Sequence, residues 1–88
     1  QPSPVITLNR AVAVEKLRGA QVALDMIEPL EKQLSGYFHY FGARGWLLVQ
    51  LGRDAEARIA FDRAIALANS AQEAAHIRRH LDRLQQRV

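Results

Sequence analysis

The sequence predicts an all-α protein of about five helices, paired as antiparallel hairpins that stack into a short right-handed superhelix. Two observations lead to this fold class. Apolar residues recur three and four positions apart along most of the chain, and no stretch has the strict alternation typical of a strand. The chain also matches itself at an offset of thirty-four positions, a period typical of stacked helical repeats. With 88 residues and 49% hydrophobic content, we expect one small domain, 1–88.

The first two predicted helices are separated by a glycine. Ser3 stands before a proline, which favours a helix start, and a helix is expected over about 4–18. Gly19 is a natural stop. A second helix follows, and Pro29 should end or kink it because proline cannot donate the backbone hydrogen bond. Together these helices form repeat one, about 4–34.

Repeat two, about 37–68, is densely apolar and aromatic. We expect a helix over about 37–51, a tight turn at Gly52, and a fourth helix from Asp54 to about Ala68.

A last helix, about 71–86, should cap the stack. Ser70 and Glu73, three positions apart, predict a capping box at its start. Its apolar face carries Ile77, Leu81 and Leu84.

The repeated positions resemble those of the tetratricopeptide (TPR) family, which has the same period of thirty-four positions. Pairs at this offset are Arg10 and Arg44, Val14 and Leu48, Leu17 and Leu51, Ala23 and Ala57, and Ile27 and Phe61. The signature positions of repeat two are Phe41, Gly45, Leu48, Gly52, Ala57, Phe61 and Ala64. Gly45 and Ala57 are expected to let paired helices approach, with Phe41, Leu48 and Phe61 filling the space between them. Repeat one departs from the pattern at Pro29, so its second helix should be shortened or bent.

Glycines inside the third helix predict close packing. Glycine costs about 1 kcal/mol relative to alanine in a helix interior, so Gly42 and Gly45 are both expected at tight contacts.

A more specific resemblance covers essentially the whole chain. The residues that carry it are Pro2-Ser3-Pro4-Val5, Leu8-Asn9-Arg10-Ala11-Val12-Ala13-Val14, Gly19, Leu51-Gly52-Arg53, Glu56-Ala57, Phe61 and Ala64-Ile65-Ala66-Leu67-Ala68. These strings resemble the C-terminal TPR extension of a group of bacterial extracytoplasmic-function (ECF) sigma factors. The chain would then be a fragment of a longer protein.

The resemblance implies regulation of transcription initiation. The full protein would direct RNA polymerase to promoter DNA through an N-terminal part outside this sequence. This segment would act in the cytoplasm by contacting its own N-terminal sigma domains, RNA polymerase or another protein. The alternative is a general TPR scaffold that binds a peptide or helix in its concave groove.

On a TPR stack the first helix of each repeat lines the concave face. The candidate partner-binding residues there are Val12, Glu15, Lys16, His39, Trp46, Val49 and Gln50. Trp46 is either a binding anchor or a core residue, and the sequence leaves both interpretations open.

Asn9 and Arg10 match the sigma-factor strings but also have a structural interpretation. Arg10, repeated as Arg44, would be a buried arginine held by a carboxylate such as Glu15 or Glu56.

The last helix predicts a basic surface. His76, Arg79, His80, Arg83 and Arg87 recur at helical spacing and would be a solvated face or, alternatively, a site for DNA or an acidic protein. His76 and His80 have the spacing of a zinc pair but no obvious third ligand.

The sequence offers no site for catalysis, a cofactor or a metal. It has no cysteine, no phosphate-binding glycine loop and no nucleophile beside a base, so we do not expect this chain to be an enzyme. Its apolar runs are too short to span a membrane. An apolar edge around Val5, Leu8 and Trp46 is expected to be exposed in the isolated fragment, where it would favour a homodimer.

Overall fold

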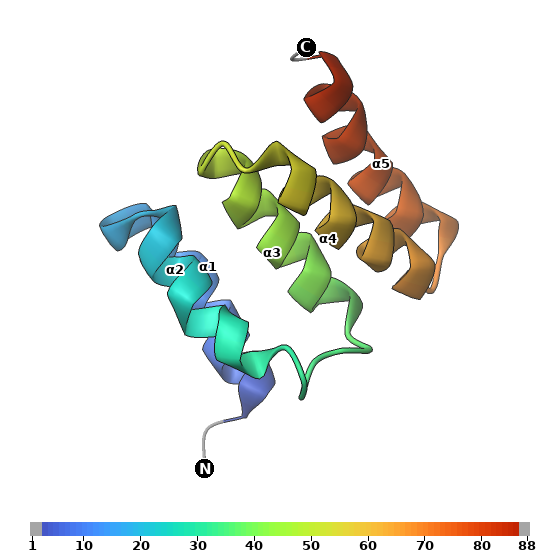
Figure 1. Cartoon of the computed structure of the whole chain (residues 1–88). Coiled ribbons are helices and arrows are strands. Elements are labelled where there is room, and N and C mark those ends of the chain that lie inside the picture. The colour runs from blue at the N-terminus through green and yellow to red at the C-terminus, as the bar shows by residue number, and fades with distance from the viewer. Residues whose placement is uncertain (1–2, 87–88) are drawn as a thin grey trace.

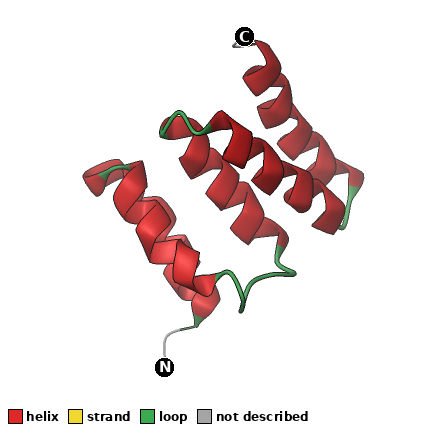
Figure 2. Cartoon of the chain, viewed as in Figure 1, coloured by secondary structure: helices red, strands yellow, loops and turns green. Residues whose placement is uncertain are grey.

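The computed structural model describes residues 3–86, and within that range every regular element is helical (Figures 1 and 2). The elements are α1 (Pro4–Arg18), α2 (Ala20–Ile27), the 3-10 turn η1 (Glu28–Leu30), α3 (Phe38–Gln50), α4 (Asp54–Leu67) and α5 (Ala71–Gln86). The predicted all-α fold class is confirmed. Pro2 and Arg87 lie outside the described residues. Within the described range, each helix is too short or too polar to cross a membrane.

The helices pair as two consecutive hairpins followed by α5. α1 packs against α2, and α3 packs even more extensively against α4. The hairpins meet where α2 lies against α3, and α5 packs mainly on α4 at the far end of the row (Figure 1). This order of contacts agrees with the stacking that the repeat period predicts.

Two glycines reverse the chain inside the hairpins. Gly19 and Gly52 have φ angles of 90° and 73°, a region that side chains with a Cβ rarely adopt. Gly19 follows α1 and Gly52 follows α3, so each hairpin turns at its glycine.

Pro29 shortens repeat one as expected. α2 has 8 residues and passes into η1, whereas α4, its counterpart in repeat two, has 14 residues. Pro29 lies in η1, where its missing N–H costs no α-helical hydrogen bond.

Side chains cap the first and last helices. Ser3 Oγ accepts a hydrogen bond from Val5 N–H at 3.2 Å, and Ser70 Oγ accepts one from Glu73 N–H at 3.1 Å. The carboxylate of Glu73 accepts from Asn69 N–H at 2.9 Å, one residue before the partner that a standard capping box uses.

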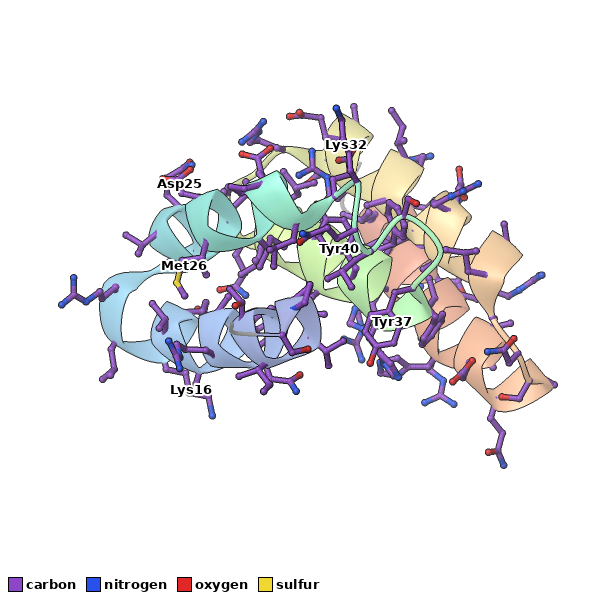
Figure 3. The ribbon with its side chains drawn as sticks, turned by 90° about the horizontal axis from the view of Figure 1, so that it is seen from below. Lys16, Asp25, Met26, Lys32, Tyr37 and Tyr40 are labelled. Atoms are coloured by element: carbon purple, nitrogen blue, oxygen red, sulfur yellow. The ribbon has the colours of Figure 1, made fainter. Side chains whose placement is uncertain are left out.

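The core lies between the helices of each hairpin and at the junction of the two. Its largest fully buried side chains are Leu24, Ile27, Tyr40, Leu47, Leu48 and Phe61. The prediction that Phe41 fills the space between helices is wrong in part, because Phe41 is only half-buried. It lies at the edge of the core, where the Arg63 guanidinium is 5.8 Å from its ring centroid. Tyr40 occupies the interior position instead (Figure 3).

Replacing Tyr40 by phenylalanine is expected to leave the free energy of unfolding unchanged or to raise it by up to about 1 kcal/mol. The hydroxyl is buried and makes no hydrogen bond of good geometry among the described residues, although Arg44 lies near it, and burial raises the pKa of Tyr40. Nearby Glu28 and Glu31 act in the same direction, and the charge of Arg44 opposes them. Urea unfolding of Tyr40→Phe, with the half-buried Tyr37→Phe as control, measures this. A loss above about 1 kcal/mol would mean that the hydroxyl makes a stabilising bond.

Candidate functional site

Two cavities that share Trp46 and His80 form one groove between α3 and α5, here called the α3–α5 groove. One cavity, of about 390 Å³, is lined by Val12, Phe38, His39, Gly42, Ala43, Trp46, His76, Ile77 and His80. The other, of about 280 Å³, is lined by Trp46, Val49, Gln50, His80, Arg83 and Leu84. Five of the predicted partner-binding residues therefore lie together: Val12, His39, Trp46, Val49 and Gln50.

Trp46 combines the two roles that the sequence left open. It is half-buried and packs on the core, and it also lines both cavities of the groove. Its position on α3 faces α5, where His80 and Arg83 stand opposite. The side chain is therefore held by the core while part of its surface stays available to a ligand, as is typical of binding anchors.

The groove has an aromatic lining with one guanidinium, that of Arg83. Three imidazoles, from His39, His76 and His80, and the guanidinium of Arg83 line it, and none of its lining residues is acidic. The ring centroids of His76 and His80 are 5.0 Å apart in an edge-to-face arrangement. This chemistry suits an extended or helical segment that carries carboxylates next to an apolar side chain.

Glu15 and Lys16, also predicted for the concave face, do not line the groove. Lys16 lies on the outer side of α1, away from α3 and α5 (Figure 3). The helical period placed them one turn after Val12, but the groove follows α3 and α5 and contacts α1 only at Val12.

The basic surface of α5 divides into two sets of residues. His76, His80 and Arg83 line the groove, whereas the exposed Arg79 lines neither of its cavities. His80 is half-buried because its ring stacks on Phe61, with centroids 5.2 Å apart and an interplanar angle of 14°. The solvated-face interpretation therefore holds for Arg79 but not for His80.

Acidification is expected to destabilise the domain through His80. Burial, followed by the charges of His76 and Arg83, lowers the pKa of His80 below its ordinary value. Phe61 from α4 and Trp46 from α3 are the other groups around the ring. The imidazole of His80 binds a proton more readily in the unfolded chain than in the folded one. The free energy of unfolding is therefore highest above about pH 6.5, and it falls as the pH drops through the pKa that His80 has in the unfolded chain.

Urea unfolding midpoints at about pH 7.5 and about pH 5.5, on either side of the ordinary histidine pKa, measure this effect. His80→Gln should reduce the difference between the two midpoints. His39→Gln, at an exposed position of α3, is the control for the loss of an imidazole. An equal difference in wild type and His80→Gln would contradict the assignment.

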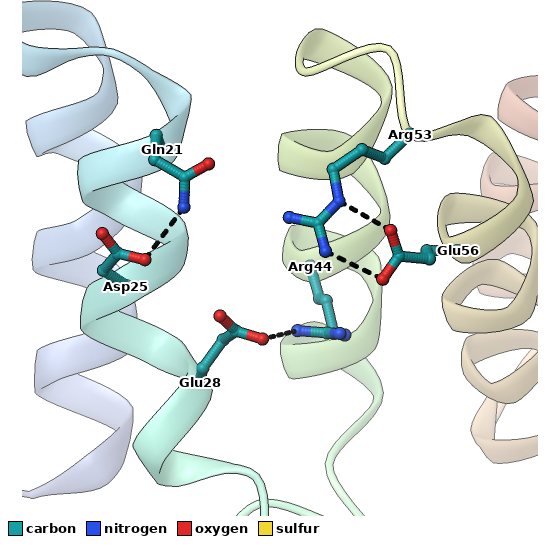
Figure 4. Close-up of polar contacts among 6 residues, drawn as sticks. All are labelled: Gln21, Asp25, Glu28, Arg44, Arg53 and Glu56. Atoms are coloured by element: carbon teal, nitrogen blue, oxygen red, sulfur yellow. Dashed lines mark hydrogen bonds and ion pairs between the residues drawn. The ribbon is translucent and has the colours of Figure 1, made fainter.

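The prediction of a buried Arg10 is wrong. Arg10 and Asn9 are both exposed, because no element of the described structure covers their side of α1. Glu56, a proposed partner of Arg10, instead accepts two hydrogen bonds from Arg53, at 2.6 and 2.8 Å (Figure 4).

Arg44, the counterpart of Arg10 in repeat two, does have the structural role. Its Nη1 lies 3.1 Å from Glu28 Oε2, and its side chain is 18% exposed (Figure 4). The ion pair links α3 to the end of α2, between the two hairpins. The remaining motif residues Gly45, Ala57, Phe61 and Ala64 are buried, with the Phe61 ring against Gly45, and Gly52 forms the turn.

The apolar edge predicted around Val5, Leu8 and Trp46 is not exposed as expected. Leu8 is 2% exposed, and the other two residues are half-buried. The large apolar side chains that α1 does expose include Ile6 at 55% and Leu17 at 88%. Any homodimer through α1 would therefore use a different face.

His76 and His80 have no third candidate metal ligand beside them in the described range. Between residues 3 and 86, no three or more of the histidine, aspartate and glutamate side chains are arranged to hold a metal ion.

The sequence pattern does not predict that α5 completes the groove. It indicates two separate surfaces, one for the candidate residues of α3 and one for the basic residues of α5. The contact that brings α5 to α3 is visible only in the structure, where Ile77 is 2% exposed and its Cδ1 would lie 3.5 Å from a Cβ at Gly42. A small residue on α3 thus marks where α5 approaches.

Comparison with known proteins gives one informative match. The chain is 68% identical over 84 residues to an uncharacterized protein of Rhizobium meliloti (strain 1021), a match that covers 96% of this chain and 20% of the relative. The chain thus spans about a fifth of the length of that relative. No family model matches the chain. No solved structure matches it significantly.

Proposed function

We propose that this chain is the C-terminal regulatory domain of a bacterial ECF sigma factor, and that it modulates transcription initiation by binding a protein segment in the α3–α5 groove. The sequence strings around Asn9-Arg10 and Leu51-Gly52-Arg53 support the family. The observation that carries the binding role is the groove itself, where the half-buried Trp46 faces His80 and Arg83.

The lining indicates the kind of segment that fits. Trp46, Val49 and Leu84 offer an apolar floor, Arg83 offers positive charge, and the imidazoles offer N–H donors. The occupant is an acidic segment with an apolar anchor, supplied by the N-terminal sigma domains, RNA polymerase or a regulator. In this proposal the domain works in the cytoplasm, performs no catalysis, and leaves promoter DNA to the N-terminal part of the protein.

In vitro transcription with core RNA polymerase tests the proposal. The full-length protein is compared with a truncation just before Gln1, and with that truncation plus this domain added back. A loss of transcripts on truncation makes the domain an activator, and a gain makes it an intramolecular brake. No change would contradict the proposal.

A matched pair of charge reversals localises the effect. Arg83→Glu and Arg79→Glu alter exposed arginines of the same helix by the same charge, but only Arg83 lines the groove. Arg83→Glu in the full-length protein should shift transcription in the same direction as truncation, and Arg79→Glu should not. Equal effects of both, growing weaker steeply with salt, would instead indicate DNA binding by the basic face.

The alternative function is a TPR scaffold unconnected to RNA polymerase, and Trp46 in the groove favours it equally. The two differ in the gene upstream of Gln1. Helical sigma domains with a basic promoter-binding helix support the first function, whereas unrelated repeats or a membrane anchor support the second.

A further inference from the structure

One face of α1 carries a stripe of uncovered residues. Ile6, Arg10, Ala13 and Leu17 are spaced four, three and four apart, so they lie in line along the helix. Ile6 is 55% exposed and Leu17 is 88% exposed, and Arg10 and Ala13 are also exposed. The face is apolar with one cation near its middle.

The same stripe is covered in repeat two. One repeat period later stand Tyr40, Arg44, Leu47 and Leu51, of which Tyr40 and Leu47 are 0% exposed. α2 packs beside this part of α3 and η1 follows it, and Glu28 at their junction pairs with Arg44. The helix that precedes α3 therefore supplies the carboxylate for its arginine.

The same two residue types recur at the next junction. Arg78 stands one repeat period after Arg44, and Asp62 stands one repeat period after Glu28. Arg78 of α5 and Asp62 of α4 line one cavity together with Ile65 and Leu81. At the first junction the arginine and the carboxylate form an ion pair, and at the second the equivalent residues line the same cavity.

We propose that a helix encoded directly upstream of this segment packs across Ile6, Arg10 and Leu17, as α2 packs on α3. Glu28 precedes Arg44 by 16 residues, so the upstream helix carries an aspartate or glutamate 16 residues before Arg10, paired with it. This helix buries the apolar stripe and neutralises Arg10. The proposal follows from the repeat and is independent of the sigma-factor assignment.

Two observations favour this occupant over a second copy of the chain. Two α1 helices face to face would bring Arg10, Lys16 and Arg18 of each copy together without a matching excess of carboxylates. The equivalent stripe on α3 is also covered by the preceding helix of the same chain and not by a second copy.

Thiol labelling of the full-length protein, with all other cysteines replaced by serine, tests the proposal. Leu17→Cys is compared with Ile59→Cys, whose side chain on α4 is 70% exposed. Without an upstream helix on α1, both thiols would react with a soluble maleimide at similar rates. We expect Leu17→Cys to react at least about tenfold more slowly, because it is buried in the complete protein. The substitutions replace exposed residues, so both variants should fold.

Charge reversal identifies the occupant. Adding Arg10→Glu to Leu17→Cys should speed its labelling, and changing the acidic residue at the proposed upstream position to arginine should slow it again. Similar rates for Leu17→Cys and Ile59→Cys would overturn the proposal. So would slow labelling that depends on protein concentration, which indicates a second copy, or a residue at the upstream position that is neither aspartate nor glutamate.

Discussion

Replacing Phe61 by alanine is expected to lower the free energy of unfolding by about 3 to 5 kcal/mol. The side chain is 0% exposed and is the aromatic residue of α4 that reaches both neighbouring helices. Its ring fills the space over Gly45 on α3 and stacks on His80 of α5. Because a chain of this size is stable by about 5 to 10 kcal/mol, the loss would take a large part of the total.

Urea and thermal unfolding, followed by helical circular dichroism, measure this loss. The midpoint temperature should fall by roughly 15 to 25 °C for a domain of this length. Ile59→Ala, on the same helix but 70% exposed, is the matched control and should change stability by less than about 0.5 kcal/mol. Similar losses for both variants would contradict the role given to Phe61. In Phe61→Ala the pKa of His80 should also rise toward its ordinary value, since the stacked ring no longer covers it.

The fold was predictable because its signals are local or strictly periodic. The cap at Ser3, the turns at Gly19 and Gly52, and the break at Pro29 each act within a few residues, and the structure confirms all four. The repeat offset then indicated how successive hairpins pair. None of these signals requires knowledge of the chain's three-dimensional packing.

The site was harder to predict because it depends on contacts between distant elements. Arg10 and Arg44 are identical residues at equivalent positions, yet Arg44 is paired with Glu28 and Arg10 is exposed. The difference is whether a helix precedes them in the described structure, which the residues themselves do not encode. For the same reason the sequence predicted only the α3 side of the groove. The position of His80 opposite Trp46 depends on the angle at which α5 leaves α4.

Replacing Gly45 by alanine is expected to lower the free energy of unfolding by up to about 2 kcal/mol, the net of an overpacking cost and a gain in helix propensity. A Cβ at this position would lie 2.5, 2.6 and 2.8 Å from three carbons of the Phe61 ring. The ring is fully buried and has no room to withdraw, so overpacking costs about 1 to 3 kcal/mol. Alanine gains about 1 kcal/mol in helix propensity, which offsets only part of that cost.

Replacing Gly42, one turn earlier on α3, is expected to change the free energy of unfolding in the opposite direction. A Cβ there would meet only Ile77 Cδ1, at the ordinary contact distance of 3.5 Å, so the expectation of a tight contact at Gly42 is wrong. Gly42→Ala should therefore raise stability by about 0.5 to 1 kcal/mol. The smaller side chain of Phe61→Leu should leave room for the new methyl group and reduce the stability cost of Gly45→Ala. A double-mutant cycle should then show a coupling free energy above about 0.5 kcal/mol. The close approach of Phe61 to Gly45 predicts both opposite stability changes for the two glycine variants and a coupling with Phe61. If both variants changed the free energy of unfolding in the same direction, or if no coupling were found, contacts other than the one at Gly45 would determine the α3–α4 distance.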